Sequence, residues 1–570
     1  MRFFKLLSPS VILILMIMFS AILFVSKFNI LLTFLFLSFT IFLVVITDKS
    51  NTKVNRSFFA GLLSILVILG NQVKYSTVGA SYEKNTIQTN ISLEKLVDFF
   101  GCFVIIFFLL KGVEYITIYI KVSPQKRRRS SNIFETSLFV FIFLIILWMP
   151  YLLTLYPGCV LPDSLSSINQ ALGNSPLSNH HPVIFTLFLK FFIKLFSFLG
   201  LNKSIFIYTL VQTFIFASIL TYFIFWLKKY GISRYLRLLI LVYFAVAPAF
   251  PIYALNVQKD TLFTSYLFLF TLKCIDVAVA KKQNNGMLSA LVISGVLATF
   301  YRNNGLYIVF ITLFVLTIVL IKQKRYHQSI YILGTYCVIT FLLVNPLISR
   351  YSVPTATAES FGVPLQQVSR TVVLNGKIGK EDKEYLNQLL PISEYKNYSP
   401  MLADSIKWNS NFNNDLLNNN PKKFIKVWVH LLPRNFKIYV DAYLLNTYGF
   451  WAPFEKNPYG FLDTRVNTNN LNIKQVDLIK LGTGSNVMER VIEKRNFLGS
   501  GTLLCLMIIS FYLYWIKKRP LLWVGYLPGF LTWLSIMVAT PVAFSLRYVF
   551  ILAMSLPLFF CLPFLNLKSR

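Results

Sequence analysis

Apolar stretches of roughly 20 residues recur along most of the chain, and this feature limits its possible folds more than any other. A helix needs about 20 predominantly apolar residues to cross the hydrocarbon core of a bilayer. Hydrophobic residues fill 56% of the 570 positions, enough for many crossings. The sequence therefore predicts an all-α polytopic membrane protein. Its N-terminal apolar run lacks an A-x-A-like cleavage site, so we expect it to be kept as the first span.

Basic residues give the predicted spans a direction. The formal net charge is +33, and many of the lysines and arginines cluster in short loops between apolar runs. This pattern is typical of cytoplasmic loops in membrane proteins, so we expect a bilayer partner and no nucleic-acid partner. Three such loops contain Lys121, Lys126, Arg127, Arg128 and Arg129; Lys228, Lys229, Arg234 and Arg237; and Lys517, Lys518 and Arg519.

Placing these loops in the cytoplasm predicts about fourteen transmembrane helices, with both termini inside. They group into a four-span module (1–130), a seven-span core (131–349) with an external loop at 155–203, and a three-span module (497–570). The expected spans lie near 9–26, 28–46, 58–72, 96–119, 134–154, 204–226, 236–255, 261–280, 287–301, 305–321, 329–347, 497–516, 520–538 and 546–563.

Two segments are expected to lie outside without crossing. The stretch 182–199 is apolar, but counting it as a span would place the basic loop after residue 227 on the wrong side. Lys190 and Lys194 lie four residues apart, on one helical face, so we expect an amphipathic helix in the outer interface. The polar region 350–496 has neither apolar runs nor cysteines and predicts one mostly helical or mixed extracytoplasmic domain.

Polar residues gather at the predicted external ends of the core helices and of the last span. Arginine on the outer side opposes the usual charge bias, and such a residue needs a reason, for example an anionic partner. We therefore predict one site on that face. Its candidate members are Asp163, His180 and His181 in the first external loop, Lys259 and Asp260 in "NVQKDTLF", Arg302 and Asn303 in "YRNNGLY", and Arg547 in "AFSLRYVF".

Each candidate also has a structural alternative. Asp163 and Asp260 each precede a helical pattern and are suitable helix N-caps. His181, followed by Pro182, could itself be an N-cap with a first-turn proline. The basic candidates could extend to lipid headgroups instead of binding a substrate. Their shared position on one face favours the single site over these separate roles.

The chemistry of such a site follows from its residue types. A carboxylate half-shielded by the interface is expected to have a raised pKa and to act as a general base towards a hydroxyl. The basic residues, with the histidines, suit a phosphate. Asp163, Asp260 and His181 are the candidate ligands for a divalent cation, Mg²⁺ or Mn²⁺.

An external loop with an early aspartate, then a "HP" pair opening an interfacial helix, resembles the C-type (GT-C) glycosyltransferases, including protein O-mannosyltransferases and aminoarabinose transferases. The stretches "YPGCVLPDSLSSINQAL", "SNHHP", "VPLQQVSRTVVLNGKI" and "LLNTYGFWAP" more closely resemble an uncharacterised Gram-positive family of multi-pass membrane proteins placed near that superfamily. The resemblance implies a GT-C-like core over 131–349.

In that superfamily the aspartate of the first external loop is the base, which corresponds to Asp163 here. An acidic residue of the second external loop corresponds to Asp260, and a basic residue that contacts the lipid phosphate corresponds to Arg302. The Asp-Glu pair common in O-mannosyltransferases is Asp163-Ser164 here, which leaves metal dependence open.

The resemblance implies a membrane glycosyltransferase that takes a sugar from a polyprenyl-phosphate donor to a cell-envelope glycan, lipid or protein acceptor. It would lie in the cell membrane, with its active face outside. A flippase or transporter for a lipid-linked glycan is an alternative, although transporters usually place ionisable groups near the midplane. A glycan polymerase or ligase is a further alternative, with the same face and the same large external domain.

Overall fold

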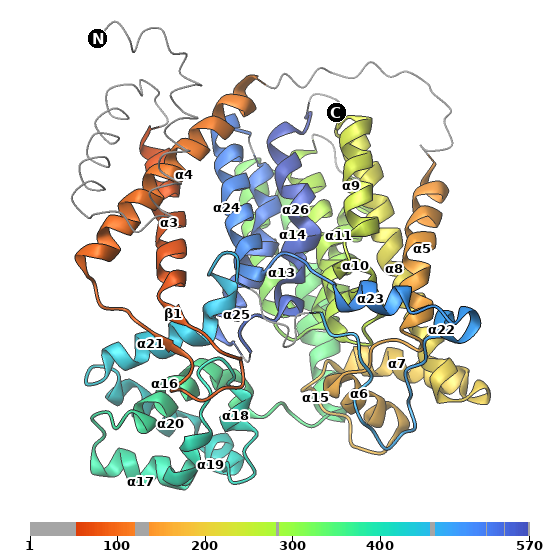
Figure 1. Ribbon diagram of the computed structural model, residues 1–570. Coiled ribbons are helices and arrows are strands. Elements are labelled where there is room, and N and C mark those ends of the chain that lie inside the picture. The colour runs from red at the N-terminus through yellow and green to blue at the C-terminus, as the bar shows by residue number, and fades with distance from the viewer. Residues whose placement is uncertain are drawn as a thin grey trace, which may run out of the picture.

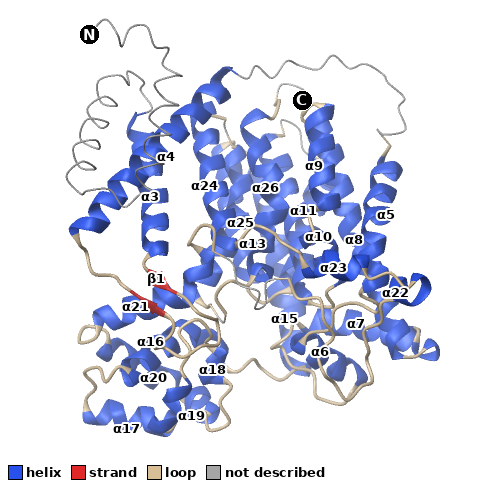
Figure 2. Cartoon of the chain, viewed as in Figure 1, coloured by secondary structure: helices blue, strands red, loops and turns tan. Residues whose placement is uncertain are grey.

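The computed structural model describes residues 53–119, 136–280, 284–455, 462–519, 521–540 and 542–567, and these residues are largely helical (Figures 1 and 2). Strands β1 (Val73–Lys74) and β2 (Thr86–Ile87) pair antiparallel in a two-stranded sheet. The predicted spans 9–26 and 28–46 lie outside the described residues.

Eight helical segments of this described part are long and apolar enough to cross a membrane, or nine if one bent pair forms a single span. The bent pair is α9 (Arg234–Val246) and α10 (Ala249–Leu255), which meet at 53°. The eight are α4 (Leu93–Tyr119), α5 (Ser137–Thr154), α8 (Leu201–Lys229), α11 (Lys259–Val279), α13 (Gly305–Lys322), the run from α14 (Tyr326–Cys337) to α15 (Asn345–Tyr351), α24 (Ser500–Lys517), and the segment Leu546–Phe564 that contains α26 (Phe550–Cys561).

Shorter apolar helices occupy the remaining predicted spans of the described part. They are α3 (Lys53–Asn71), α12 (Asn285–Tyr301), and the stretch Leu522–Val538 that includes α25 (Leu527–Val538). The all-α multi-pass class is therefore confirmed, and the full count of fourteen crossings remains a prediction.

The helix bundle has a buried centre and an apolar outer surface. Helix α11 lies at the centre, and its residues Leu262, Phe268 and Leu272 are fully buried. On the outer helix α5, by contrast, Leu138 and Ile146 are 66% and 58% exposed. Large apolar side chains that face outward over several helices fit a lipid environment.

Helices from the two ends of the chain pack together. Arg56 of α3 and Glu114 of α4 form a buried ion pair, with 2.6 Å between the Arg56 Nη2 and Glu114 Oε2 atoms. The Tyr512 hydroxyl of α24 donates a hydrogen bond to the same Glu114 oxygen. The described part of the N-terminal module is therefore joined to the C-terminal spans by a buried polar contact.

The long polar region divides into two parts. Residues 357–447 form a helical domain with its own apolar core, which includes Leu386, Leu389, Leu417 and Phe424. Residues 462–493, called the strap here, run back to the membrane bundle, where Val466 pairs with Val160 and Val476 with Tyr156. The domain contains α16 (Gly362–Val373), α17 (Lys380–Leu389), α18 (Asp404–Lys407), α19 (Asn414–Asn419), α20 (Pro421–Leu431) and α21 (Phe436–Thr447); the strap contains α22 (Leu478–Thr483) and α23 (Val487–Glu493).

The helical domain lies at the same end of the bundle as α6 (Pro162–Leu172) and α7 (Val183–Leu195), opposite the C-terminus (Figure 1). Helix α7 has 13 residues and is too short to cross a bilayer, which takes about 20 residues. It buries one face, which includes Phe185, Leu189 and Phe192, against the bundle. This agrees with a helix that does not cross, while the side of the membrane on which this end lies remains a prediction.

Candidate functional site

Helix α6 positions Asp163, the first candidate residue. The helix starts at Pro162, which suits the first helical position because its ring fixes φ and its missing N–H needs no partner there. Leu161 is the N-cap residue, and its backbone N–H donates to the Ser164 hydroxyl at 3.1 Å. Asp163 is thus inside the first turn, so the N-cap alternative for Asp163 is wrong.

Asp163 is paired with Arg547, a residue 384 positions away in the sequence. The Arg547 Nη1 atom donates to Asp163 Oδ2 at 2.9 Å, and Nη2 donates to the Tyr548 hydroxyl at 2.8 Å. The guanidinium carbon lies 4.8 Å from the centre of the Tyr548 ring. Arg547, from the 3₁₀ helix η9 (Leu546–Val549), therefore points inward to an acid and does not extend to headgroups.

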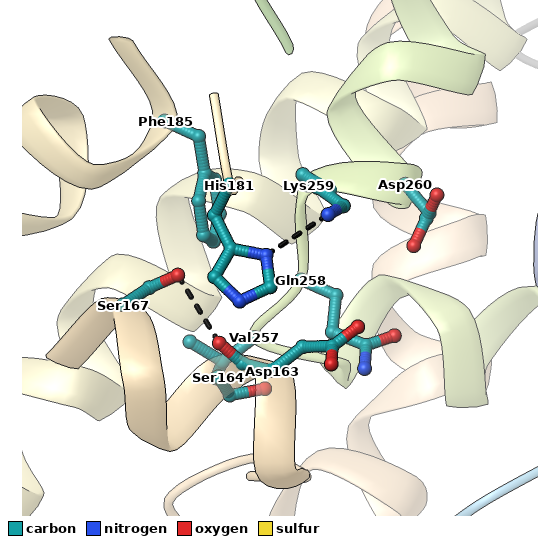
Figure 3. A pocket seen from close by; sticks show the side chains of 9 residues that line it. All are labelled: Asp163, Ser164, Ser167, His181, Phe185, Val257, Gln258, Lys259 and Asp260. Carbon is teal, nitrogen blue, oxygen red and sulfur yellow. Dashed lines mark hydrogen bonds between the residues drawn. The ribbon is translucent and has the colours of Figure 1, made fainter. Parts of the chain in front are cut away.

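Lys259 and Asp260 begin α11 and point in different directions (Figure 3). The Lys259 Nζ atom lies 2.9 Å from His181 Nδ1. The Asp260 Oδ1 atom lies 2.8 Å from Arg302 Nη1, and the Asp260 side chain is 2% exposed. Gln258 is the N-cap residue of this helix, so the N-cap alternative for Asp260 is also wrong.

Arg302 is enclosed by aromatic rings as well as by its acid. Its guanidinium carbon lies 5.5 Å from the Phe263 ring centre and 5.1 Å from the Tyr548 ring centre. Its Nη1 atom also donates to the Tyr548 carbonyl oxygen at 3.4 Å. Arg302 is only 8% exposed, so the alternative in which it extends to lipid headgroups does not hold.

One pocket brings together the two segments that are predicted to be the first and second external segments (Figure 3). Its acidic side chains are Asp163 and Asp260, and its basic side chain is Lys259. Arg547 forms an ion pair with Asp163, and Arg302 with Asp260. The lining residues are Asp163, Ser164, Ser167, His181, Phe185, Val257, Gln258, Lys259 and Asp260.

The acidity of Asp163 differs from the expectation. Burial raises the pKa of this carboxyl, but the positive charges of Arg547 and Lys259, with His181 and the Arg547 hydrogen bond, lower the pKa well below its usual range. The predicted raised pKa is therefore wrong for this arrangement, because nearby positive charge outweighs desolvation. Asp163 is ionised and tightly held, which makes it a weak base until Arg547 is drawn away.

The pKa values of both histidines are lowered, and His181 is neutral at physiological pH. Burial and the charge of Lys259 lower the pKa of His181 to about 3, against a smaller opposing effect of Asp163. The pKa of His180 is lowered as well, first by burial and then by Lys259. A neutral His181 can accept a hydrogen bond from the Lys259 ammonium. The N-cap alternative for His181 does not hold, since Pro182 is the N-cap of α7.

Two candidate residues, Asn303 and His180, do not line the pocket but contact the segment next to it. The Asn303 amide donates to the Asn179 carbonyl at 2.8 Å, and the Thr355 hydroxyl donates to the same oxygen at 2.9 Å. His180 packs edge-to-face on His181 and on Trp408, with ring centres 4.5 and 6.0 Å away. These contacts fix the segment that carries His181.

Sequence reasoning missed Gln258 and Tyr548. Gln258 lines the pocket, and Tyr548 contacts both arginines. Both had a signal, because each is next to a candidate residue in the chain. Both signals are weak, because tyrosine is common in apolar runs and a single glutamine beside a charged pair is not distinctive.

The predicted cation ligands do not form a ligand set in this arrangement. Asp163 is hydrogen-bonded to Arg547, Asp260 forms an ion pair with Arg302, and His181 Nδ1 lies within hydrogen-bond distance of Lys259. Across the part of the chain that the structure describes, no three His, Cys, Asp or Glu side chains group in a way that would hold a metal ion. Metal dependence remains a prediction, and no chemical step is assigned to a metal below.

The fold and site define a multi-pass membrane protein with a charged pocket at one end of its helix bundle. The chain belongs to the Family of unknown function (DUF6020), whose pattern matches residues 172–570. The match includes every candidate residue except Asp163. No curated protein and no solved structure matches the chain.

Proposed function

We propose that this protein is a membrane glycosyltransferase. It would move a sugar from a polyprenyl-phosphate donor to a cell-envelope acceptor on the outer face of the cell membrane. The observation that carries the proposal is the charged pocket itself: a carboxylate, Asp163, bonded to an arginine, Arg547, beside Lys259 at one end of a helix bundle.

The charge of this cluster suits a phosphate. Lys259, Arg302 and Arg547 lie beside the carboxylates of Asp163 and Asp260, three positive charges against two, while His181 is neutral. Arg547 is 20% exposed at its side chain and Arg302 only 10%. We therefore assign binding of the donor phosphate to Arg547 and Lys259, and Arg302 positions Asp260.

The reaction needs one bond formed and one broken. The acceptor hydroxyl oxygen attacks the anomeric carbon of the sugar, and the bond between that carbon and the phosphate oxygen breaks. Polyprenyl phosphate leaves with the electron pair of that bond. The hydroxyl proton passes to the carboxylate of Asp163, which acts as the general base.

Donor binding also provides a way to activate that base. A phosphate that binds Arg547 competes with Asp163 for the same guanidinium, which can grip a phosphate through two parallel hydrogen bonds. Loss of Arg547 removes the largest of the charges that lower the Asp163 pKa. In this proposal Asp163 becomes a stronger base only when the donor is in place.

The position of the pocket supports an enzyme over a transporter. Transporters place their substrate site near the bilayer midplane, between repeats. Here Asp163 lies on α6 and Lys259 at the first residue of α11, at the end of the bundle near the helical domain (Figure 1). A site at a helix end suits a donor whose lipid lies in the bilayer and whose sugar lies outside it.

A transfer assay tests the proposal directly. Purified full-length protein in bilayer nanodiscs is given radiolabelled polyprenyl-phosphate glucose, galactose or mannose, together with cell-envelope material. Transfer of label from lipid to the envelope fraction supports the proposal. Movement of intact labelled lipid between leaflets of proteoliposomes, without transfer, would favour the flippase alternative and reject the enzyme.

A further inference from the structure

Two buried polar side chains that line the pocket have unused hydrogen-bonding atoms. Gln258 is 3% exposed and Asp260 is 2% exposed. Neither the Oε1 nor the Nε2 atom of Gln258 has a hydrogen-bond partner among the described residues, and the same holds for Asp260 Oδ2. Buried polar groups in proteins are almost always bonded, so such a pair needs an explanation.

The Gln258 backbone is fixed while its amide is left free. The Val257 N–H donates to the Cys159 carbonyl at 3.0 Å, and the Gln258 N–H donates to the Asn256 carbonyl at 2.7 Å. Gln258 has extended backbone angles at the N-cap position of α11, and its side chain makes no capping hydrogen bond. The amide instead lines the pocket with Asp163 and Asp260 (Figure 3).

A second buried glutamine, Gln212, provides a comparison within the bundle. Gln212 is fully buried in α8, and its Nε2 atom donates to the carbonyls of Ala254 and Asn256 at 2.9 and 2.7 Å. Its Oε1 atom accepts from the Tyr208 hydroxyl at 2.9 Å. The amide of Gln212 is satisfied at both ends by the protein, and that of Gln258 at neither.

The kind of free atom identifies the kind of ligand. Gln258 Oε1 and Asp260 Oδ2 are acceptors, so they need a group that donates hydrogen bonds, while Gln258 Nε2 needs an acceptor. An ionised phosphate has no donor, and Asp260 would repel it. A hydroxyl both donates and accepts, and neighbouring ring hydroxyls match two acceptors and one donor.

We propose that Gln258 and Asp260 form a subsite that binds the hydroxyl groups of the donor sugar, next to the phosphate position at Arg547 and Lys259. This subsite rests on the proposed function and extends it, because it gives the enzyme a means to select the sugar as well as the lipid phosphate. Gln258 is then a specificity-determining residue that contacts the substrate.

The variant Gln258→Met separates this role from a structural one. Methionine has a similar length and no polar group that needs a partner, so it removes an unsatisfied amide from the interior. The free protein should unfold at a higher temperature than wild type. Its affinity for polyprenyl-phosphate sugars should fall about tenfold, since two or more hydrogen bonds are lost. Its affinity for polyprenyl phosphate without a sugar should not change.

Gln212→Met is the matched control. It breaks satisfied hydrogen bonds and leaves the Ala254 and Asn256 carbonyls without this donor, so the free protein should unfold at a lower temperature. It should retain the wild-type ratio of affinities between sugar-linked and bare lipid. Opposite stability changes in the two variants, with loss of sugar preference in Gln258→Met only, support the subsite.

The experiment measures unfolding temperature and binding of full-length protein in nanodiscs. The probes are polyprenyl phosphate and its glucose, galactose and mannose derivatives. If wild type binds bare lipid as tightly as every sugar-linked lipid, the subsite is rejected while phosphate binding stands. If wild type binds none of these lipids, the proposed function itself fails. Stabilisation of wild type by Mg²⁺ or Mn²⁺ alone, lost in Gln258→Met, would replace the sugar subsite with a cation site.

Discussion

At the scale of single residues, the pairing of Asp163 with Arg547 decides what the pocket can do. The two side chains come from α6 and η9, and their ion pair is 35% and 20% exposed at the side chains. The Arg547 Nη1 and Asp163 Oδ2 atoms are 2.9 Å apart, and because both side chains are partly exposed, a competing anion can reach the ion pair. Asp163 is therefore held in its ionised form, and under the proposed function the donor phosphate would release it from Arg547.

Asp163→Asn tests the role of this carboxylate. Asparagine keeps the size of the side chain, and α6 does not depend on this residue for its cap. If Asp163 is the general base, transfer activity should fall by about 10²- to 10⁴-fold at unchanged membrane abundance. Turnover of radiolabelled polyprenyl-phosphate sugar is the measurement. Activity within a few-fold of wild type would reject Asp163 as the base.

Asp477→Asn is the control for that substitution. Asp477 caps α22 in the strap by accepting from the Lys480 N–H, and asparagine caps about equally well. This variant removes a negative charge of the same kind from a position outside the pocket. It should retain wild-type turnover. A loss of turnover in Asp163→Asn can then be attributed to the position of Asp163 in the pocket and not to the removal of one negative charge.

His181 makes stability depend on pH. Its pKa is about 3 in the folded protein, against about 6.5 in an unfolded chain. The unfolded state therefore binds more protons between these values, and stability falls as the pH drops below about 6.5. The slope should reach about 1.4 kcal/mol per pH unit.

His181→Gln should flatten this pH dependence, because glutamine does not titrate. Unfolding temperature between pH 7 and pH 5 is the measurement, with His180→Gln as the companion variant because the pKa of His180 is lowered too. Lys259, Asp163 and Arg547 are the charged groups that face His181, and they are unchanged in both variants. An identical slope in wild type and His181→Gln would mean that His181 is protonated without cost.

At the scale of elements, α7 determines how the chain reaches the pocket. Its 13 residues span about 20 Å, which is short of the roughly 30 Å hydrocarbon core. Lying at the bundle end, it presents a face with Phe185 to the pocket and places His181 just before its start. A crossing helix here would move the start of α8 to the opposite side of the membrane from Asp163.

Cysteine labelling of intact cells tests the placement of α7. Single cysteines at Asn202 and Asn418 should react with a membrane-impermeant maleimide from outside. One at Lys518 should react only after permeabilisation, since the basic residues there predict a cytoplasmic loop. The six native cysteines are free, so they are replaced first. Labelling at Asn202 only in permeabilised cells would show that α7 crosses.

At the scale of the whole molecule, the helical domain is joined to the segment that carries Arg547. The Ala543 N–H donates to the Met401 carbonyl at 3.0 Å, and Leu402 pairs with Val542. Gly449, just after α21, approaches the same segment so closely that a Cβ would collide with the Phe544 backbone. Phe544 lies three positions before Arg547, so a shift of the Phe544 backbone would also shift Arg547 at the pocket.

Gly449→Ala should therefore harm both stability and transfer. The neighbouring backbone must shift, at a cost of about 1–3 kcal/mol. Displacement of Arg547 should lower turnover by about tenfold or more. Gly482→Ala is the control, because a Cβ there meets no atom within 4 Å. Unfolding temperature and turnover are measured for both variants. Equal values for the two would show that the contact at Gly449 does not influence the pocket.

The sequence by itself determined the class of the protein and the charged residues of the candidate pocket. Apolar runs of bilayer length require helices, and every predicted span within the described residues is helical. Polar residues are costly in such surroundings, so Asp163, Lys259 and Arg302 could be found as exceptions to an apolar pattern. Such local signals need no knowledge of which helices are neighbours.

The tertiary structure decided how those residues act. The partner of Asp163 lies 384 residues away, so neither the ion pair nor the lowered pKa of Asp163 follows from local sequence. The free amide of Gln258 and the satisfied amide of Gln212 look alike as letters in an apolar chain. They differ because hydrogen bonding and electrostatics depend on distances between atoms, and packing of remote segments sets those distances.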